Sequence, residues 1–378
     1  MTDIQRRTLL KLGTGAVAIA ATSVGFNAVT KNGSANSAEP FFGKHQSGIA
    51  TESQVHATWA SFTLNSQPNR DALGRLMRVW TTDAARLMAG QPALADNEET
   101  LAIGNSNLTI TFGFGPELLK GLGHNLLNEL PEFSIDNLQS QWNGGDLLIQ
   151  VCANDQVKVH HALRELTIDA LPFAQLIWRQ SGFLPSGDLA AKQTPRNLMG
   201  QKDGTMNFKT DTAEFDRTVW INEGPAIGGT TLVIRRIQMH LDSWEKLSPD
   251  LKGKVIGRDL THGAPLTGGD EFAPGDFEKS DHHGLVIPGD AHIRRARTAE
   301  FKIHRRGYNY QSDSTATGVV DHGLIFATFQ ADLRQFIEIQ KRLASMDSLN
   351  TWTTPIGSAV FLIPPGCDDG GWIGQTLI

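Results

Sequence analysis

Two short segments, far apart in the sequence, carry side chains suited to the same chemistry. The first places Asp203 between Gly200 and Gly204, and the second supplies His292 followed shortly by Arg305. A histidine can ligate iron, a carboxylate can act as a general base, and a guanidinium can stabilise developing negative charge. An iron-bound histidine that faces a carboxylate and a guanidinium across a haem is the minimum equipment of a peroxidase.

Each of these residues also has a simpler explanation when it is taken alone. The two glycines allow backbone dihedral angles that other residues avoid, so they either aim Asp203 at a ligand or form an ordinary surface turn. His292 is one of 12 histidines, and the other eleven are interpreted as surface or structural residues. Arg305 is either a solvated charge or a fixed cation that faces an anionic group. The combination therefore carries more information than any single member.

The remaining metal-binding residue types form no ligand pattern that we recognise. His282 and His283 are adjacent, so their side chains point apart, and no Glu-x-x-His partner accompanies them. The sequence has 2 cysteines and no Cys-x-x-Cys motif, which argues against a zinc or iron–sulfur site. Cys152 and Cys367 are expected to be two separate buried thiols, and a disulfide in an oxidising compartment is the alternative.

The composition is that of an ordinary soluble protein. The chain has 378 residues, of which 40% are hydrophobic and 20% charged, with a formal net charge of −6. This length is sufficient for two domains with cores of their own. The negative charge and the absence of a basic stripe argue against a nucleic-acid groove. The 38 glycines favour many turns and a sizeable β content.

Residues 1–38 are predicted to be a twin-arginine signal peptide. Arg6 and Arg7 precede an apolar run from Leu9 to Val29 that is interrupted by glycine, threonine and serine. The run is too weak for a stable transmembrane helix, so no membrane insertion is expected. Twin-arginine export carries folded proteins, which suits a protein that acquires a cofactor in the cytoplasm. The expected location is the periplasm or the medium.

The mature chain is predicted to be an α+β protein with two ferredoxin-like domains and antiparallel sheets. The first domain, residues 39–200, shows the order strand, helix, strand, strand, helix, strand of a split βαβ unit. Its expected elements are 55–62, 69–89, 108–114, 147–152, 156–166 and 173–180.

The second domain, residues 201–378, repeats this pattern more weakly. Phe114 and Glu117 of the first half match Phe329 and Asp332 of the second, which suggests a duplicated unit. Its expected elements are strands at 230–240 and 358–363 and helices at 241–247 and 333–344, with a strand that ends near Phe329. Residues 253–322 break the regular pattern, and a connection of this length is usually functional.

Taken together, these motifs resemble the dye-decolourising peroxidase family, in particular its twin-arginine-exported deferrochelatase/peroxidase branch. The resemblance runs from about Gly43 to Gly366, and the Gly-x-x-Asp-Gly element at 200–204 is the family signature. It is carried by the segments 45–49, 108–115, 197–204, 233–237, 291–295, 305–308, 323–326 and 357–361. The resemblance implies one haem b per chain, held mainly by the C-terminal domain.

The resemblance also implies roles for individual residues. His292 corresponds to the proximal iron ligand, with Asp347 as candidate hydrogen-bond acceptor for its other nitrogen and Asn350 as a weaker one. Asp203 and Arg305 correspond to the distal catalytic pair. The residues expected to contact the haem are Gly204, Thr205, Met206, His292, Arg297 and Arg305.

The implied reaction is oxidation of dyes, phenols or other one-electron donors by hydrogen peroxide, through a ferryl intermediate. Two alternatives stay open: a deferrochelatase that releases iron from haem with the porphyrin intact, and a non-catalytic periplasmic haem-binding protein. The other expected partners are the small-molecule or dye electron donor and the twin-arginine export machinery. The sequence leaves the oligomeric state open, including a homo-oligomer. Tyr308 and Tyr310, which follow Arg305, are expected to be core residues rather than an electron relay.

Overall fold

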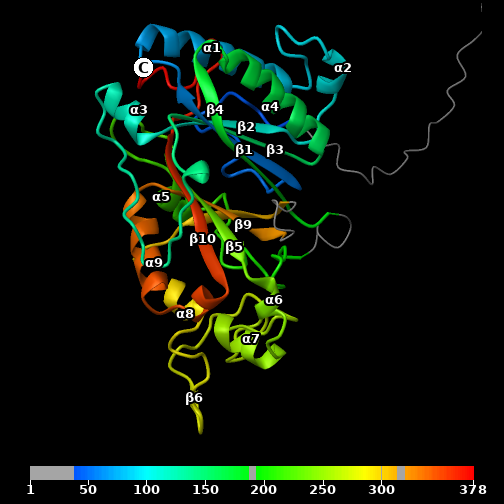
Figure 1. Ribbon diagram of the computed structural model, residues 1–378, viewed down its shortest axis with the longest axis vertical. Helices are drawn as coiled ribbons and strands as arrows, with labels where there is room; N and C mark the ends of the chain where they lie inside the picture. Colours follow the sequence, from blue (N-terminus) through cyan, green and yellow to red (C-terminus); the bar gives the residue numbers. More distant parts are fainter. Residues whose placement is uncertain (1–37, 187–192, 299, 313–319) are drawn as a thin grey trace, which may run out of the picture. The chain divides into compact units, whose positions relative to one another are not determined.

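The N-terminal half forms a four-stranded antiparallel sheet with helices on its outer face (Figure 1). The computed structural model describes residues 38–186, 193–298, 300–312 and 320–378. The strands lie in the order β4-β1-β3-β2, which is the order of a ferredoxin-like sheet, so the predicted pattern is confirmed. The elements of this half are β1 His56–Leu64, α1 Arg70–Met88, α2 Glu99–Ala102, β2 Thr109–Phe114, α3 Pro116–Gly121, η1 Ser140–Trp142, β3 Leu147–Ala153, α4 Gln156–Ala170 and β4 Ala174–Phe183.

Helix α1 forms where the spacing of its apolar residues predicts it. The side chain of Asn69 caps the helix by accepting a hydrogen bond of 3.0 Å from the backbone N–H of Ala72, which satisfies one of the free donors of the first turn. The buried face of the helix consists of Leu73, Leu76, Met77, Trp80, Ala84, Leu87 and Met88. The indole of Trp80 stacks on Phe112 of β2, with ring centroids 5.1 Å apart. Burial of such aromatic and aliphatic side chains stabilises the fold by about 1.5–3 kcal/mol each.

The C-terminal half contains a second antiparallel sheet, in the order β8-β9-β5-β10. Relative to the chain order this repeats the arrangement of the first sheet, as the duplicated pattern predicts. Helix α9 begins at Leu333, and the side chain of its N-cap residue Asp332 forms a capping box with Gln335. The elements of this half are α5 Ala213–Val219, β5 Thr230–Met239, α6 Leu241–Trp244, α7 Pro249–Ile256, β6 Ser280–Asp281, β7 Gly284–Leu285, α8 His292–Ala296, β8 His304–Ser312, β9 Asp321–Gln330, α9 Leu333–Met346, η3 Ser348–Thr351 and β10 Thr353–Ile363.

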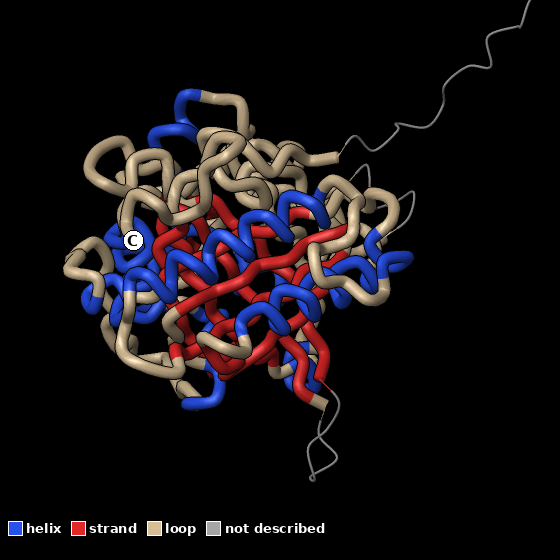
Figure 2. The backbone as a smooth tube through the Cα atoms, turned by 90° about the horizontal axis from the view of Figure 1, so that it is seen from above, coloured by secondary structure: helices blue, strands red, loops and turns tan. Residues whose placement is uncertain are grey.

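The two sheets join into one closed eight-stranded barrel, which the sequence did not predict. Each seam is narrow: the backbone register pairs Phe114 with Leu362 at one seam and Phe183 with Asn309 at the other. The barrel is filled by buried side chains from both halves, which include Trp59, Leu232, Tyr308, Phe329 and Phe361. Figure 2 shows the helices on the outer side of these strands. Because both halves fill the same core, each depends on the other for burial of its inner face.

Residues 253–322 are more regular than expected. The segment contains the last turn of α7, the short helix α8 and all nine residues of β8, which pairs with β9 along its full length. Among the described residues, the stretch between α7 and α8, apart from the two-residue strands β6 and β7, and the short connection between α8 and β8 keep the loop character that composition indicates. The expectation of a long irregular segment is therefore wrong for β8, and this difference matters because β8 carries Arg305.

Several other predictions about single residues are confirmed. Cys152 and Cys367 are free and buried. Tyr308 and Tyr310 have exposed fractions of 0% and 1%, so both are core residues. The hydroxyl of Tyr310 donates a hydrogen bond of 3.0 Å to Asp321. Within the described parts of the chain, no helix combines the length and the apolar character that a membrane span requires. The predicted signal peptide lies outside the described residues except for Ala38.

Candidate active site

The loop that carries Asp203 is built by its own polar side chains. Asn197 accepts hydrogen bonds from the backbone N–H groups of Met199 and Gln201, at 3.1 and 3.2 Å. Gly200 and Gly204 have positive φ angles of 83° and 114°, which non-glycine residues rarely adopt. The sequence therefore fixes the turn on both sides of the carboxylate, as the spacing of the two glycines predicts.

Strand β8 holds this loop and presents Arg305 to it. The backbone N–H and C=O of Arg305 bond to the side-chain amide of Asn207, at 3.2 and 2.7 Å. Asn309, on the same face of β8, accepts from Leu198 N–H and donates to the Arg196 carbonyl, both at 3.1 Å. These contacts place the loop against the strand along its length.

The result is a close contact between the two predicted distal residues. Arg305 Nη1 donates to Asp203 Oδ1 at 3.3 Å, and the side chains are 27% and 21% exposed. A β-carbon built at Gly307 would lie 3.6 Å from the other oxygen of Asp203, so the carboxylate rests against a part of β8 that carries no side chain. A carboxylate and a guanidinium are thus paired where a small ligand can reach both.

The neighbouring basic residues of β8 have a different role. Arg306 points to the opposite side of the strand, is 3% exposed, and bonds to the Thr51 carbonyl and to Gln54 Oε1. Burial, together with the charges of Arg306 and Arg305, lowers the pKa of His304 to about 4. His304 is therefore neutral at neutral pH, and Arg305 is the cation of β8 that faces Asp203.

His292 begins helix α8 and is oriented by Asp347. Its Nδ1 lies 2.6 Å from Asp347 Oδ2, and the Asp347 side chain is only 2% exposed. The other Asp347 oxygen accepts from the Leu349 N–H at 2.9 Å. Asn350, the weaker candidate, instead donates to the Leu343 carbonyl. When Nδ1 donates to this carboxylate, Nε2 of the neutral imidazole has a lone pair that can bind a ligand.

One apolar cluster connects the surroundings of the two pairs. We call it the Met199 cluster; its buried members are Met199, Met239, Trp244, Val255, Ile256 and Leu324. Leu198 of the Asp203 loop, Ile293 beside His292 and Leu349 beside Asp347 all pack against it. The indole N–H of Trp244 donates to the Met199 carbonyl at 2.9 Å. The cluster therefore links the Asp203 loop to the segments of His292 and Asp347 through apolar contacts.

The other residues predicted to contact the cofactor are not part of the Asp203–Arg305 pair. Thr205 donates its hydroxyl to Glu271 at 3.0 Å, and Met206 is 63% exposed. Arg297 is exposed, with its guanidinium carbon 4.7 Å from the centre of the Phe277 ring. Arg297 contacts neither Asp203 nor Arg305 among the described residues.

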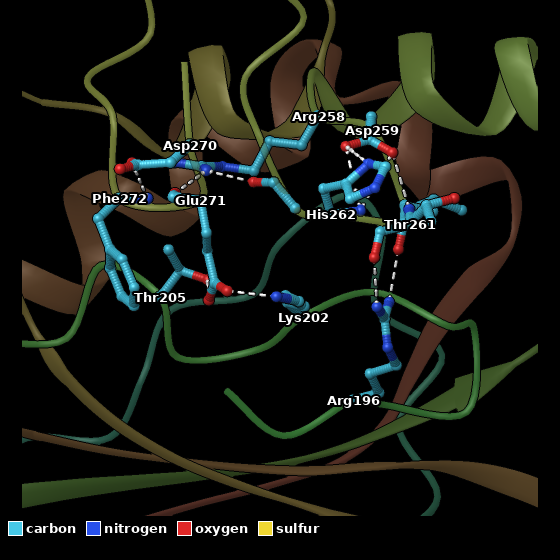
Figure 3. A network of polar contacts seen from close by, with 12 residues as sticks. Arg196, Lys202, Thr205, Arg258, Asp259, Thr261, His262, Asp270, Glu271 and Phe272 are labelled. Carbon is cyan, nitrogen blue, oxygen red and sulfur yellow. Dashed lines mark hydrogen bonds and ion pairs between the residues drawn. The ribbon is translucent and has the colours of Figure 1, made fainter. Parts of the chain in front are cut away.

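A polar network ties the Asp203 loop to the segment that follows α7 (Figure 3). The Glu271 carboxylate accepts hydrogen bonds from the side chains of Lys202 and Thr205, which lie on either side of Asp203 in the sequence. Arg258 holds Glu271 in turn, by donating to its backbone carbonyl at 2.7 Å. Burial alone would raise the pKa of Glu271. Hydrogen bonds from Lys202 and other donors outweigh this effect and keep that pKa below its usual value. Sequence reasoning did not find Glu271.

Arg196 reinforces the same attachment from the other end of the loop. Its guanidinium donates to the Gly200 carbonyl at 2.7 Å and to the carbonyls of Leu260 and Thr261 at 2.5 and 2.7 Å. The loop is thus held between β8 on one side and residues 258–272 on the other. An arrangement of this kind fixes a catalytic group before a ligand arrives.

Two cavities lie away from these residues, on the N-terminal half. One, of about 390 Å³, is lined by α1 residues with Trp372 and Ile378. The other, of about 310 Å³, lies beside α4. Neither is lined by Asp203, Arg305 or His292. We therefore place the candidate active site from the chemistry of the side chains and their contacts, and treat the α4 cavity separately below.

Comparison with known proteins agrees with this fold. The family models described as "Dyp-type peroxidase, N-terminal" and "Dyp-type peroxidase, C-terminal" match residues 46–184 and 194–368. A dye-decolorizing peroxidase from Thermobifida fusca is 37% identical over 334 residues, which cover 83% of this chain and 77% of the relative. A deferrochelatase from Escherichia coli is 35% identical over 99% of this chain and 96% of the relative.

The solved structures give the same result. A DyP-type peroxidase from Cellulomonas bogoriensis superposes with a TM-score of 0.86, at 42% identity, covering 90% of this chain and 98% of that chain. The chain belongs to the Dyp-type peroxidase family and has its two-domain fold with antiparallel sheets.

Proposed function

We propose that this protein is a haem b peroxidase that uses hydrogen peroxide to oxidise dyes, phenols or other one-electron donors. The observation that supports the proposal best is the contact of 3.3 Å between Arg305 Nη1 and Asp203 Oδ1, whose side chains are both partly exposed. A general base beside a fixed cation is what cleavage of a peroxide bond needs, whereas simple haem storage needs neither.

His292, Asp347 and the Met199 cluster have the chemistry that a haem cofactor needs. Nε2 of His292 is available because Asp347 holds Nδ1, and the resulting imidazole is a strong donor to iron. The Met199 cluster is apolar and belongs to the C-terminal half. These features support one haem per chain, held mainly by that half. By resemblance, Gly204, Thr205 and Met206 would lie along the haem edge.

The side chains divide the reaction between them. Haem, when bound, would supply the iron that coordinates peroxide and the electrons that break the O–O bond. Asp203 takes the proton from the oxygen nearer the iron and returns it to the far oxygen, so that water can leave. Arg305 stabilises the negative charge that develops on the departing oxygen. Arg297 would neutralise a propionate group, as the family resemblance implies.

The absorption spectrum of the purified, haem-supplied protein tests this proposal. A Soret band that shifts on addition of one equivalent of peroxide, followed by oxidation of a small phenol, is expected. A protein that stays colourless with haem would overturn the cofactor assignment. A coloured protein that does not react with peroxide would favour a non-catalytic haem-binding protein instead.

Iron release from haem is a second candidate function for the same pocket. It is favoured by the Escherichia coli deferrochelatase, which matches 99% of this chain. Incubation with haem and a ferrous chelator separates the two reactions. Appearance of free protoporphyrin would support iron release, and its absence, with phenol oxidation intact, would restrict the protein to the peroxidase reaction.

Glu271 is predicted to position Asp203 without touching the reacting atoms. Glu271→Gln removes the charge that holds Lys202, while the amide oxygen still accepts from Thr205. We expect roughly a tenfold lower rate constant for the reaction with peroxide, since misplaced groups lose catalysis steeply, with unchanged haem content and unchanged affinity for the phenol. Glu278→Gln, an exposed change on the same segment, is the matched control. Equal rates for the two variants would remove Glu271 from the mechanism.

We further propose that the protein is exported through the twin-arginine machinery to the periplasm or the medium. The proposal rests on Arg6 and Arg7 and the weak apolar run that follows them. Replacement of both arginines by lysine should leave the protein, with its signal still attached, in the cytoplasm of the host. Export of that variant at the normal level would contradict the proposal.

A further inference from the structure

A second cluster of ligand-type side chains lies on the N-terminal half, outside the proposed haem site. His161 and Glu165 are one turn apart on α4, and Asp96 comes from the loop between α1 and α2. Figure 1 shows α4 beside α1 on the outer face of the sheet. Each residue offers one ligand atom, and the three atoms all lie within 4.8 Å of one another.

The pair at the centre of this cluster is buried. His161 Nε2 lies 2.9 Å from Asp96 Oδ2, and the two side chains are 4% and 0% exposed. The other Asp96 oxygen accepts from the Glu98 N–H at 2.8 Å. The backbone therefore fixes Asp96 toward α4, so that its free oxygen faces the imidazole.

The spacing of these atoms is that of ligands around one metal ion. Nitrogen and oxygen ligands lie about 2.0–2.2 Å from a divalent transition metal, so neighbouring ligands at right angles are about 3 Å apart. The separation of 2.9 Å between His161 and Asp96 matches this value. An imidazole with two carboxylates is a donor set for zinc and similar divalent ions. The ligand atom of Glu165 lies within 4.8 Å of the other two, and a turn of this partly exposed side chain would complete the set.

The surroundings supply a second, independent observation. A cavity of about 310 Å³ beside α4 is lined by Asp83, Glu98, Glu165 and Asp169, with Arg164 as its one arginine or lysine. Asp169 Oδ2 is shielded from solvent and receives no hydrogen bond from an N–H or hydroxyl donor among the described residues, and its carboxyl group lies within hydrogen-bond reach of that of Asp83. A buried carboxylate oxygen without a donor is costly, and a cation in the adjacent cavity would remove that cost.

A purely structural role explains less of this arrangement. An Asp96–His161 hydrogen bond would by itself attach the loop to α4. It gives no reason for the third ligand atom of Glu165, for the Asp169 oxygen without an N–H or hydroxyl donor on the same face of α4, or for the four carboxylates in the wall of the cavity.

We propose that Asp96, His161 and Glu165 bind one divalent transition-metal cation of the zinc type, with the α4 cavity as its entry path and as room for water ligands. Asp169 and Asp83 would lie in the outer shell, where a carboxylate adds to the attraction for the ion. The proposal is independent of the haem function, since it uses none of the residues of that site.

Titration calorimetry with Zn²⁺, on the full haem-loaded chain after treatment with a chelator, tests the proposal. One equivalent of Zn²⁺ is expected to bind to the unaltered protein. Glu165→Gln and His161→Gln should each weaken that binding by at least about tenfold. His240→Gln, an exposed change on the C-terminal half, should leave it unchanged.

The variants keep the outcome clear even if one of them folds poorly. Glu165 is partly exposed, so its replacement is the safer test if His161→Gln unfolds, and the Soret band and melting temperature report on folding. Loss of the equivalent in both variants but not in His240→Gln supports the site. Absence of binding to the unaltered protein, or binding that survives both changes, for example at the His282–His283 pair, overturns it.

Discussion

Replacement of Asp203 by asparagine is expected to lower the rate constant for the reaction with hydrogen peroxide by about 10²–10⁴-fold, the usual contribution of a positioned general base. Asparagine has nearly the same shape, and its carbonyl oxygen can still accept from Arg305 Nη1. The amide cannot take the peroxide proton, so the change removes the base and leaves the pair in place. Stopped-flow measurement of the Soret band gives the rate directly.

The Asp203→Asn result is interpretable only against matched measurements. Haem content, from the ratio of Soret to protein absorbance, should equal that of the unaltered protein, because Asp203 is not an iron ligand in the proposal. Asp211→Asn, an exposed change a few residues along the chain, should react at the normal rate. A rate for Asp203→Asn within about twofold of normal would assign proton transfer to another group and leave Arg305 as the remaining distal residue.

The local structure of this protein could be predicted well because its signals are local. Apolar residues at spacings of three and four mark α1, and Asn69 marks its beginning. β-Branched and aromatic residues mark β2, and a mainly aliphatic run marks β3. The observed ends of these elements differ from the expected ones by only a few residues, as is usual where caps and hydrogen bonds decide the last turn.

The closed barrel could not be predicted in the same way. Its two seams join residues far apart in the chain, such as Phe183 and Asn309, and each seam has a single pair in register. For the seam between β2 and β10, whose residues are mostly buried on both faces, the sequence shows only apolar character and does not indicate the partner strand. Strand β8 was not predicted because Arg305, Arg306 and Asn309 make its sequence polar. In the structure these side chains contact the Asp203 loop or the protein interior.

The site was predictable to the extent that it lies within motifs. Asp203 and Arg305 were singled out from the sequence and are in contact in the structure. For His292 the sequence offered two hydrogen-bond acceptors, and the structure selects Asp347 because Asn350 is turned to the Leu343 carbonyl. Glu271 was not predictable: it is one of several acidic residues between 250 and 281, and only the folded loop brings it between Lys202 and Thr205.

Replacement of His292 by alanine is expected to abolish stable haem loading. Changes in the groups that merely orient a metal ligand already weaken metal binding by about 10–100-fold, so loss of the ligand itself should weaken haem binding by more than about 100-fold. Haem titration of the purified variant, followed at the Soret band, measures this loss. His283→Ala, which removes an exposed imidazole elsewhere in the C-terminal half, should load haem normally.

A rescue experiment separates the role of His292 in haem binding from a role in folding. Alanine at 292 leaves a gap beside Asp347, whose Oδ2 then has no partner. Free imidazole can enter such a gap, donate to that oxygen and present its other nitrogen to iron, so millimolar imidazole should restore the Soret band of the variant. A variant that is folded, as its circular dichroism would show, yet loads haem with an unaltered spectrum and no imidazole would require a different iron ligand.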